Sequence, residues 1–492
     1  MDGWQVYQSS DFAKHLDPDV FCLGNIARTF VNGTLNTVEA WPTPQSGLSV
    51  ASNIFWSREY CAAEFPFECI QSGKIRIADP YGLPDAMCDA HGLAVIPDLP
   101  GSYVLSQIYA FESAGQIFYA VFTSIFGRLT HLFFPKQRIV IKHTIAYATE
   151  ALCKYVDDQT AQAETAFPIR PFTTEKPIVF VDHVNGFGHG LWNHISGIQR
   201  LCDLGLLQDF AELWVTGRLF FGRIEDLFPE LVGRIRYFEK KSDLALAAQS
   251  QTAAVLQIGS CFFTAAARAR VCNAASRHVG IHRPAKPKPA TPVVTFTIRA
   301  GNRVCLNLAE AIPILCKPIL DLRPDTKIIL DGWVLPDDAS VHESSQLRLL
   351  KSPHASSIKA ELQIASQIAE SLPMGTTVLT TVGKGMLESI DLIQHTTLYF
   401  SHVGTLQHKI AYLADCDGLI HGPSVQLTRK EAGNFAYEGQ GRPIFIDGAF
   451  VEDVAESDQT RGGLSSAYVL CDMDRLAMQF REMFIEAVSV QD

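Results

Sequence analysis

Residues 293–304, VVTFTIRAGNRV, join a short apolar and β-branched run to a turn that contains a glycine and two arginines. The run Val293 to Ile298 has the composition of a strand that is buried on both faces. Apolar residues at helical spacing come next: Leu308, Ile312, Leu315 and Ile319. A second strand-like run follows at residues 327–330. This order predicts a βαβ unit, from which parallel sheets are built.

The same alternation continues to about residue 450. Four more strand-like runs lie at residues 376–381, 397–401, 418–421 and 443–446. Helical periods separate them at residues 356–371, 384–393 and 406–413. Six strands with intervening helices predict a doubly wound parallel sheet.

A second α/β sheet is predicted upstream, where the apolar run 176–184 precedes a helix with an apolar face. The inner face of that helix consists of Leu191, Ile195, Ile198 and Cys202. The segments FAELWVTG (210–217) and AAVLQIG (253–259) are typical of further strands. Four prolines in residues 284–292 exclude a helix and a central strand there, so we interpret this stretch as a linker.

These boundaries give a linear division of the chain. It predicts an N-terminal accessory domain of irregular, β-containing structure, a middle α/β domain, a proline-rich linker, a second α/β domain and a C-terminal helical segment. Their limits are residues 1–165, 166–283, 284–292, 293–450 and 451–492.

Composition restricts the class of protein. The chain has 492 residues, a net charge of −11 and 47% hydrophobic residues, which indicates a globular protein and argues against a nucleic-acid partner. Twelve cysteines without a CxxC pair are not typical of a zinc knuckle or a disulfide scaffold, and they favour a cytoplasmic location. No signal peptide is predicted. Residues 116–134 are long and apolar, and we interpret them as a buried core segment, with a membrane span or membrane-surface contact as alternatives.

In an open parallel sheet, ligands bind beyond the carboxyl ends of the strands. Polar and glycine-containing turns follow four of the predicted strands of the downstream sheet. Arg299 and Arg303 flank a Gly-Asn turn that precedes a predicted helix. Two guanidinium groups beside a helix N-terminus suit a phosphate or diphosphate. The alternative is that both arginines lie on the surface and form salt bridges. The other candidates are Asn302, Lys384, His402, Thr405, His421, Gly422 and Ser424. As alternatives to ligand binding, Lys384 could be an exposed residue of a plain turn and Thr405 could cap a helix. Taken together, the four turns predict a nucleotide-diphosphate pocket.

The turn after residues 178–184 carries a second set of candidates. They are Asp182, His183, Asn185, Gly188, His189 and Asn193. His189 and Asn193 are four residues apart on one helical face, and a histidine suits a general base that takes a proton from a sugar hydroxyl. His189 as a helix cap is one alternative. A metal site of Asp182, His183 and His189 is another, but these histidines have neither HxxxH nor HExxH spacing, so we expect no metal.

Residues 175–450 resemble the GT-B glycosyltransferases. The segments NGFGHGLWNHISGIQRL (185–201) and CDGLIHGPSVQLT (416–428) are similar to motifs of bacterial enzymes related to plant xylosyltransferases, with Asn193 where those have an acidic residue or asparagine. The segment FTIRAGNR (296–303) is similar to the arginine-bearing strand end of fucosyltransferase-like enzymes. The resemblance implies two Rossmann-like domains that face a cleft.

The resemblance also implies roles for the candidate residues. His189 or His183, with Asp182, would act at the acceptor hydroxyl, and Asn185, Gly188 and Asn193 would bind the acceptor. Arg299 and Arg303, helped by Lys384, would stabilise the departing nucleotide diphosphate, and the turn from His421 to Ser424 would contact the phosphates or the nucleoside.

The resulting hypothesis is a bacterial hexosyl- or pentosyltransferase of polysaccharide biosynthesis, inverting and independent of metal or other cofactors. Its partners would be a nucleotide-sugar and a glycan or lipid-linked acceptor, at the inner face of the membrane with a peripheral membrane contact. A nucleotide-sugar epimerase and a non-catalytic sugar-binding or assembly subunit are the alternatives. The oligomeric state stays open.

Overall fold

The structure is a computed structural model that describes most of the chain. The described residues are 3–26, 64–72, 76–83, 86–97, 103–123, 128–143, 149–161, 170–171, 175–182, 187–216, 220–260, 262–280, 291–337, 355–429, 437–454 and 467–489. They form two compact units. Unit 1 holds the described residues up to Phe262 except 220–228, and unit 2 holds residues 220–228 and those from Phe263 onward.

Unit 2 is built on a six-stranded parallel sheet with the strand order β15-β14-β13-β16-β17-β18. Its strands are β13 (Val293–Thr297), β14 (Lys327–Asp331), β15 (Val378–Thr380), β16 (Leu398–His402), β17 (Asp417–His421) and β18 (Pro443–Phe445). The order reverses between β13 and β16, where doubly wound sheets have their ligand crevice. The predicted doubly wound parallel sheet is therefore confirmed.

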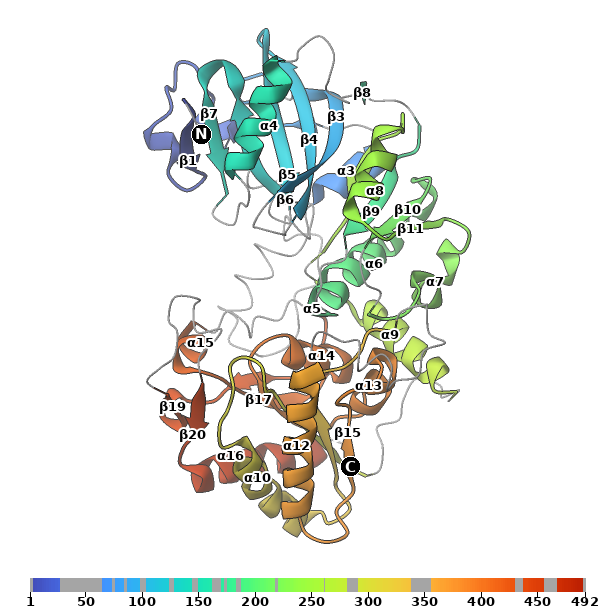
Figure 1. Ribbon diagram of the computed structural model, residues 1–492, viewed down its shortest axis with the longest axis vertical. Helices are drawn as coiled ribbons and strands as arrows, with labels where there is room; N and C mark the ends of the chain where they lie inside the picture. Colours follow the sequence, from blue (N-terminus) through green and yellow to red (C-terminus); the bar gives the residue numbers. More distant parts are fainter. Residues whose placement is uncertain are drawn as a thin grey trace. The chain divides into compact units, whose positions relative to one another are not determined.

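Helices cover both faces of this sheet (Figure 1). One face packs against α10 (Leu308–Leu322), α12 (Ala355–Ser371) and α16 (Met473–Ser489). The other carries α13 (Met386–Ile393) and α14 (Thr405–Ala414), on which α9 (Ala265–His278) packs. The smaller elements of the unit are α7 (Ile224–Leu227), α15 (Ser424–Arg429), the 3-10 helix η8 (Gly448–Phe450) and the antiparallel strands β19 (Val451–Asp453) and β20 (Tyr468–Leu470).

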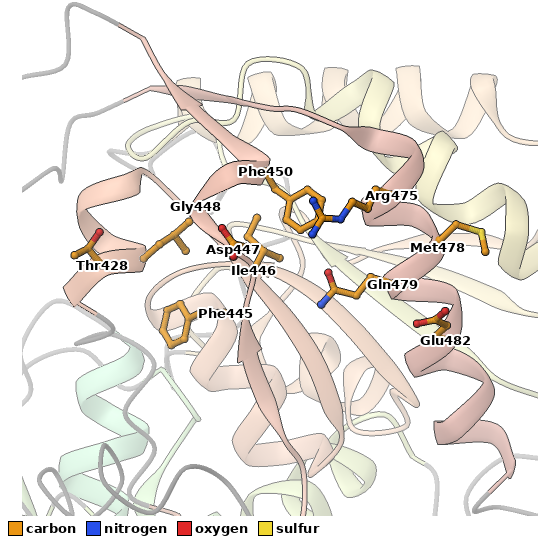
Figure 2. A pocket seen from close by; sticks show the side chains of 11 residues that line it. Thr428, Phe445, Ile446, Asp447, Gly448, Phe450, Arg475, Met478, Gln479 and Glu482 are labelled. Carbon is orange, nitrogen blue, oxygen red and sulfur yellow. The ribbon is translucent and has the colours of Figure 1, made fainter.

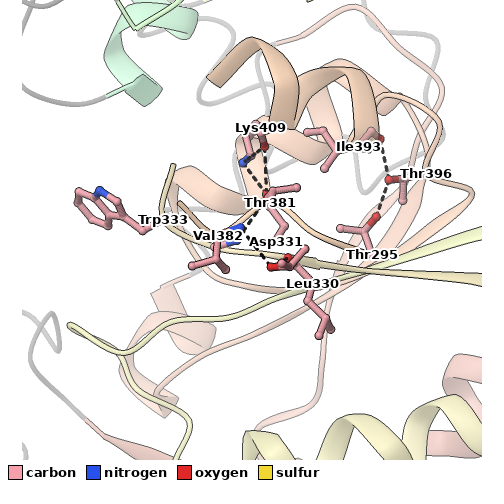
Figure 3. Close-up of polar contacts among 12 residues, drawn as sticks. Thr295, Leu330, Asp331, Trp333, Thr381, Val382, Ile393, Thr396 and Lys409 are labelled. Carbon is pink, nitrogen blue, oxygen red and sulfur yellow. Dashed lines mark hydrogen bonds and ion pairs between the residues drawn. The ribbon is translucent and has the colours of Figure 1, made fainter. Parts of the chain in front are cut away.

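A buried ion pair joins strand ends to helices in unit 2 (Figure 3). Lys409 of α14 and Asp331 of β14 are both fully buried, with Nζ and Oδ1 2.6 Å apart. Ser389 of α13 lies 3.0 Å from the same Nζ, and Thr381 donates to Asp331 Oδ1. The pair thus ties α13 and α14 to the carboxyl ends of β14 and β15.

Unit 1 contains a four-stranded parallel sheet of order β11-β10-β9-β12, which confirms the second α/β sheet. The strands are β9 (Ile178–Asp182), β10 (Leu213–Thr216), β11 (Ile235–Phe238) and β12 (Val255–Gln257). The helices are α5 (Phe187–His189), the π-helix η4 (Gly190–Ile195), α6 (Ser196–Asp203) and α8 (Lys241–Gln249). Gly197 of α6 lies so close to Gly259 that a Cβ would stand 2.8 Å from its Cα, so only glycine allows this approach.

The N-terminal part of unit 1 is a mixed eight-stranded sheet. Its strands are β1 (Gln5–Gln8), β2 (Arg76–Ile77), β3 (Ala86–Pro97), β4 (Tyr103–Ser113), β5 (Gln116–Thr123), β6 (Arg128–Phe134), β7 (Ile139–Lys142) and β8 (Arg170–Pro171). Its helices are α3 (Glu64–Ser72) and α4 (Thr149–Ala161). Short 3-10 helices of unit 1 lie at Phe12–Lys14, Pro135–Gln137, Leu206–Gln208 and Pro229–Leu231.

Within the apolar stretch 116–134, residues 116–123 and 128–134 form the antiparallel neighbours β5 and β6. Val121 and Phe133 are buried against α4, and Phe118 and Phe134 stack in a separate aromatic cluster. The interpretation as a buried core segment is confirmed. Within the described ranges no helix has both the length and the apolar character to cross a membrane.

The two sheets of unit 1 are joined by Gln107 of β4. Its side-chain amide donates to the carbonyl of Val255 at 2.7 Å and accepts from the backbone N–H of Gln257 at 3.0 Å. Leu105 of β4 also belongs to the apolar core of the parallel sheet. The linear division into modules and the cleft stay predictions, and the proline-rich linker at 284–292 lies mostly outside the described residues.

Candidate functional site

Four predicted residues come together at the carboxyl edge of the unit 2 sheet. Arg299 and Arg303 follow β13, while His402 and His421 end the neighbouring strands β16 and β17 and face each other in register. The two imidazole rings are 4.3 Å apart between centroids. These four residues are named the arginine–histidine cluster here. Their meeting follows from the strand order, because the ends of adjacent parallel strands lie side by side.

Both histidines are fully buried, and each has one ring nitrogen bonded and one without a partner. Nδ1 of His402 lies 2.9 Å from Thr297 Oγ1, and Nδ1 of His421 lies 2.7 Å from the hydroxyl of Tyr468. Neither Nε2 atom has a hydrogen-bond partner within the described part of the chain. Burial lowers the pKa of His421 to about 3, and burial with His421 and the two arginines holds the pKa of His402 well below its ordinary value. Both rings are therefore neutral near pH 7.

The two arginines bring positive charge to the cluster, and no carboxylate of the described residues forms an ion pair with either of them. Among the described residues, neither Arg299 nor Arg303 forms an ion pair, and Arg303 Nε is buried without a hydrogen-bond partner. Arg299 Nη1 makes one long bond to the carbonyl of Val403, at 3.4 Å. Burial, and then the charge of Arg303, lower the pKa of Arg299 to about 9. Arg303 is buried and Arg299 is half-buried, and cations so far removed from water are costly unless an anion joins them.

The first turn of α14 adds to the same positive potential. Gly404 precedes this helix with φ of 119°, and a Cβ on it would stand 2.7 Å from Arg303 Nη1. The guanidinium of Arg303 thus lies against the N-terminal end of a helix of ten residues, where exposed N–H groups already favour negative charge. Two buried histidines with an unpaired ring nitrogen each, two guanidinium groups and a helix N-terminus form an arrangement rich in nitrogen groups and poor in acceptor oxygens. Chemically, it suits an anion.

The remaining predicted donor-side residues lie at the same edge, with other contacts. Thr405 begins α14, and Asn302 is exposed in the turn before Arg303. Lys384 follows β15, at the far end of the sheet order, and pairs with Glu388. Gly422 and Ser424 follow His421, and the backbone N–H of Ser424 donates to Asp453 Oδ1 at 3.0 Å. The structure brings Lys384 into no contact with the arginine–histidine cluster, and the binding roles of all five residues stay predictions.

A pocket of ≈ 700 Å³ lies past the end of β18, the strand next to β17 (Figure 2). Phe445 and Phe450 give it aromatic surface, and the Arg475 guanidinium lies 5.0 Å from the centroid of the Phe450 ring. Asp447 and Glu482 add carboxylates. This volume is in the range of pockets that hold small organic ligands.

On unit 1, the structure joins two of the predicted residues directly. His189 Nδ1 lies 2.9 Å from Asn193 Oδ1, and the Asn193 amide nitrogen donates to the carbonyl of Ser260 at 2.8 Å. Because the amide NH2 is used in that bond, its oxygen must accept from His189, so the ring proton is on Nδ1 and Nε2 carries the lone pair. Burial lowers the pKa of His189, with the Asn193 bond acting in the opposite direction. The arrangement is that of an oriented base, and it lies where the π-helix η4 begins.

The other residues of that turn divide into described and undescribed ones. Asp182 is buried, and its Oδ2 pairs with Lys241 Nζ at 2.8 Å. Burial raises the pKa of Asp182, and Lys241 opposes the shift. Gly188 is buried in α5. His183 and Asn185 lie outside the described residues, and no group of three or more metal-ligating side chains occurs in the residues that the structure covers.

Four residues at these sites are absent from the sequence-based candidates. Thr297 and Tyr468 bond the cluster histidines, Lys241 bonds Asp182, and Glu361 accepts from the backbone N–H groups of Trp333 and Ala300 at 2.6 and 3.3 Å. Glu361 lies on the helix α12, and burial raises its pKa to about 7. In the sequence, a glutamate within a predicted helix beside apolar residues could have marked Glu361 as a candidate. The positions of Thr297, Tyr468 and Lys241 in the sequence give no sign that they lie at these sites.

The described fold and site define an α/β protein with two parallel sheets and a donor-rich cluster at the carboxyl edge of the larger one. No protein-family model matches the sequence, and no curated protein matches it. Among solved structures, the chain is similar to the glycosyl transferase family 9 protein from Veillonella parvula, with 9% identity, a TM-score of 0.33 and coverage of 64% of this chain and 97% of that one. It is also similar to the ADP-heptose lps heptosyltransferase II of E. coli, with 12% identity, a TM-score of 0.24 and coverage of 61% of this chain and 80% of that one. A third similar structure is the tyrosyl-tRNA synthetase of Leishmania major, with 11% identity, a TM-score of 0.19 and coverage of 46% of this chain and 45% of that one. Similarity at this level does not assign the chain to a family.

Proposed function

We propose that the protein is a glycosyltransferase that uses a nucleotide-activated sugar, and that the arginine–histidine cluster binds the diphosphate of this donor. One observation carries the proposal: the buried nitrogens Nε of Arg303 and Nε2 of His402 and His421 have no hydrogen-bond partner among the described residues. A buried donor without a partner costs about 1–3 kcal/mol, so several in one place favour a ligand that supplies acceptors. A diphosphate supplies many acceptor oxygens at once.

The same cluster suits the chemistry of the leaving group. During transfer, the bond between the anomeric carbon and the diphosphate oxygen breaks, and the electron pair leaves with the diphosphate. Arg299 and Arg303 stabilise the charge that develops on that oxygen. The two guanidinium groups and the α14 N-terminus supply the positive potential for which other enzymes use a divalent cation, so we propose metal-independent transfer.

His189 is the general base in this proposal. The oxygen of the acceptor hydroxyl forms the new bond to the anomeric carbon, and its proton passes to Nε2 of His189. The bond from Nδ1 to Asn193 fixes the ring so that Nε2 is the basic nitrogen. We also propose an inverting outcome, a glycan or lipid-linked hydroxyl acceptor and a cytoplasmic location at the membrane face.

Calorimetric titration of the full chain with nucleoside diphosphates and nucleotide-sugars tests donor binding. Removing one charged donor costs about 1.5–3 kcal/mol, so Arg303→Ala weakens the binding of the best ligand about 10- to 100-fold. Arg323→Ala is the matched control, because Arg323 lies between α10 and β14, at the opposite edge of the sheet, and pairs with Asp325. If none of these ligands binds the wild type, the proposed function is wrong.

Turnover with the bound donor and a panel of hydroxyl acceptors tests the base. His189→Ala lowers kcat about a hundredfold to ten-thousandfold, while alanine at the exposed His278 leaves it unchanged. Since the pKa of His189 is lowered, the acid limb of kcat/KM lies below pH 6.5. Anomeric analysis of the product by NMR tests inversion, and activity in EDTA tests metal independence. Conversion of the donor without an acceptor indicates an epimerase instead.

A further inference from the structure

The partners of the two cluster histidines determine which ring nitrogen carries the proton. A neutral imidazole has one N–H donor and one acceptor nitrogen. If the proton is on Nε2, the unbonded nitrogen is a donor. If it is on Nδ1, the unbonded nitrogen presents a lone pair, which repels an anion. The cluster can bind an anion through its histidines only in the first form.

At His402, the hydroxyl of Thr297 decides between these forms. Thr297 Oγ1 accepts from the backbone N–H of His402 at 2.7 Å and lies 2.9 Å from Nδ1 of the same residue. Within the described residues, the Thr297 hydroxyl has no other acceptor for its own hydrogen. A buried O–H without an acceptor is costly, so the hydroxyl donates to Nδ1, and the ring proton is on Nε2.

At His421, the hydroxyl of Tyr468 acts in the same way. Tyr468 is fully buried, and burial raises its pKa well above the ordinary value, so it keeps its proton at neutral pH. Nδ1 of His421, at 2.7 Å, is the acceptor that the described structure offers to this hydroxyl. Tyr468 itself is held by the turn after Arg303, since its backbone N–H donates to the carbonyl of Val304 at 3.0 Å. The Tyr468 hydroxyl therefore donates, and the proton of His421 is on Nε2.

We infer that Thr297 and Tyr468 are positioning residues that fix the Nε2–H tautomers of His402 and His421, so that both rings donate to a bound oxyanion. The inference rests on the proposed function for the identity of that anion as a nucleotide diphosphate. The histidines contribute donors without charge, while Arg299 and Arg303 contribute the charge. The other titratable groups near the cluster are Glu361, which accepts from the backbone N–H groups of Trp333 and Ala300, and Asp453 and Cys305, which both act to raise the pKa of Tyr468.

Long-range 1H–15N NMR of histidine-labelled full-length protein reads the tautomers without any ligand. We expect a protonated Nε2 and an unprotonated Nδ1 for both residues. Thr297→Val changes the His402 signal to mixed tautomers, Tyr468→Phe does so for His421, and Thr297→Ser restores the wild-type pattern. Thr295→Val is the matched control, because Thr295 is a buried threonine of the same strand that bonds Thr396 at 2.6 Å and no histidine.

Binding of inorganic pyrophosphate tests the consequence. Loss of one such donor weakens binding by about 3- to 10-fold, so we expect this decrease for Thr297→Val and Tyr468→Phe, and none for Thr295→Val or Thr297→Ser. Wild-type rings protonated on Nδ1 would overturn the inference, and so would unchanged pyrophosphate affinity in the variants. If pyrophosphate binds as expected but no nucleoside diphosphate or nucleotide-sugar does, the inference stands and the proposed function fails.

Discussion

Replacing Lys409 by methionine removes one partner of the buried ion pair while keeping a chain of similar length. With Nζ and Oδ1 2.6 Å apart, an effective dielectric constant of about 20 gives a gross attraction of about 6 kcal/mol. In Lys409→Met, the Asp331 carboxylate stays buried and keeps the bond from Thr381, but Oδ2 has no partner among the described residues. Loss of one member of such a pair costs about 3–5 kcal/mol. We expect this loss of local stability.

Hydrogen exchange measured by mass spectrometry is the suitable assay, because a chain of two units does not give a single free energy of unfolding. Peptides from β14, α13 and α14 report the opening free energy around the pair. We expect a decrease of about 3–5 kcal/mol there, and recovery of part of it when Asp331→Asn is added. Arg323→Met, which breaks the exposed pair with Asp325, changes exchange by less than about 1 kcal/mol. A decrease below 1 kcal/mol for Lys409→Met would refute the reasoning.

Three further outcomes are expected. Gly404→Ala costs about 1–3 kcal/mol because of the positive φ at this position, and the added Cβ displaces the Arg303 guanidinium, so we expect a lower melting temperature and weaker pyrophosphate binding. Gly301→Ala is the control, because a Cβ there has ordinary space, and it changes neither quantity. Equal effects of the two variants would contradict this reasoning. Because burial raises the pKa of Glu361 from 4.5 to about 7, the folded state binds the extra proton, and local stability falls by on the order of 3 kcal/mol as pH rises from 4.5 to 7. Hydrogen exchange of α12, corrected for the pH dependence of intrinsic exchange, shows this slope in the wild type and not in Glu361→Gln. Its persistence in the variant would disprove the assignment. Thr264→Ala removes the hydroxyl that caps α9 by accepting from the backbone N–H of Ala267 at 3.2 Å, so the stability of α9 falls by about 1 kcal/mol. Hydrogen exchange measures this loss, and Thr264→Ser, which keeps the capping hydroxyl, shows none.

The unit 2 sheet was predictable because its four central strands, β14, β13, β16 and β17, are buried on both faces. Runs such as Val293 to Ile298 are then apolar at every position or carry only short hydroxyl side chains, and helical periods between them leave parallel pairing as the simple solution. Strand ends of neighbouring parallel strands meet, so the positions of Arg299, Arg303, His402 and His421 at one edge followed from the same argument.

The contacts within the site were not predictable in this way. Thr297 is an ordinary strand residue in the sequence, and Tyr468 comes 47 residues after the histidine that it bonds, beyond the predicted end of the second α/β domain. The helical period at residues 406–413 is typical of a helix that buries one face, yet Leu406 to Ala414 are all buried, and Lys409 is inside. A lysine in such a helix signals a buried partner, but only the tertiary structure shows that it is Asp331.

The helix α9 belongs to unit 2 although it precedes the proline-rich stretch in the chain. Arg268 donates to the carbonyl of Tyr412 at 2.6 Å and pairs with Asp415 at 3.1 Å, and Val271 and Ala275 are fully buried. A fragment that starts at β13 would therefore expose the apolar surfaces of α13 and α14 and leave Asp415 without its arginine. A piece that keeps α9 together with the larger sheet starts near Phe263, upstream of the proline-rich stretch, and the contacts of α7 (Ile224–Leu227) with α9 extend unit 2 further upstream still.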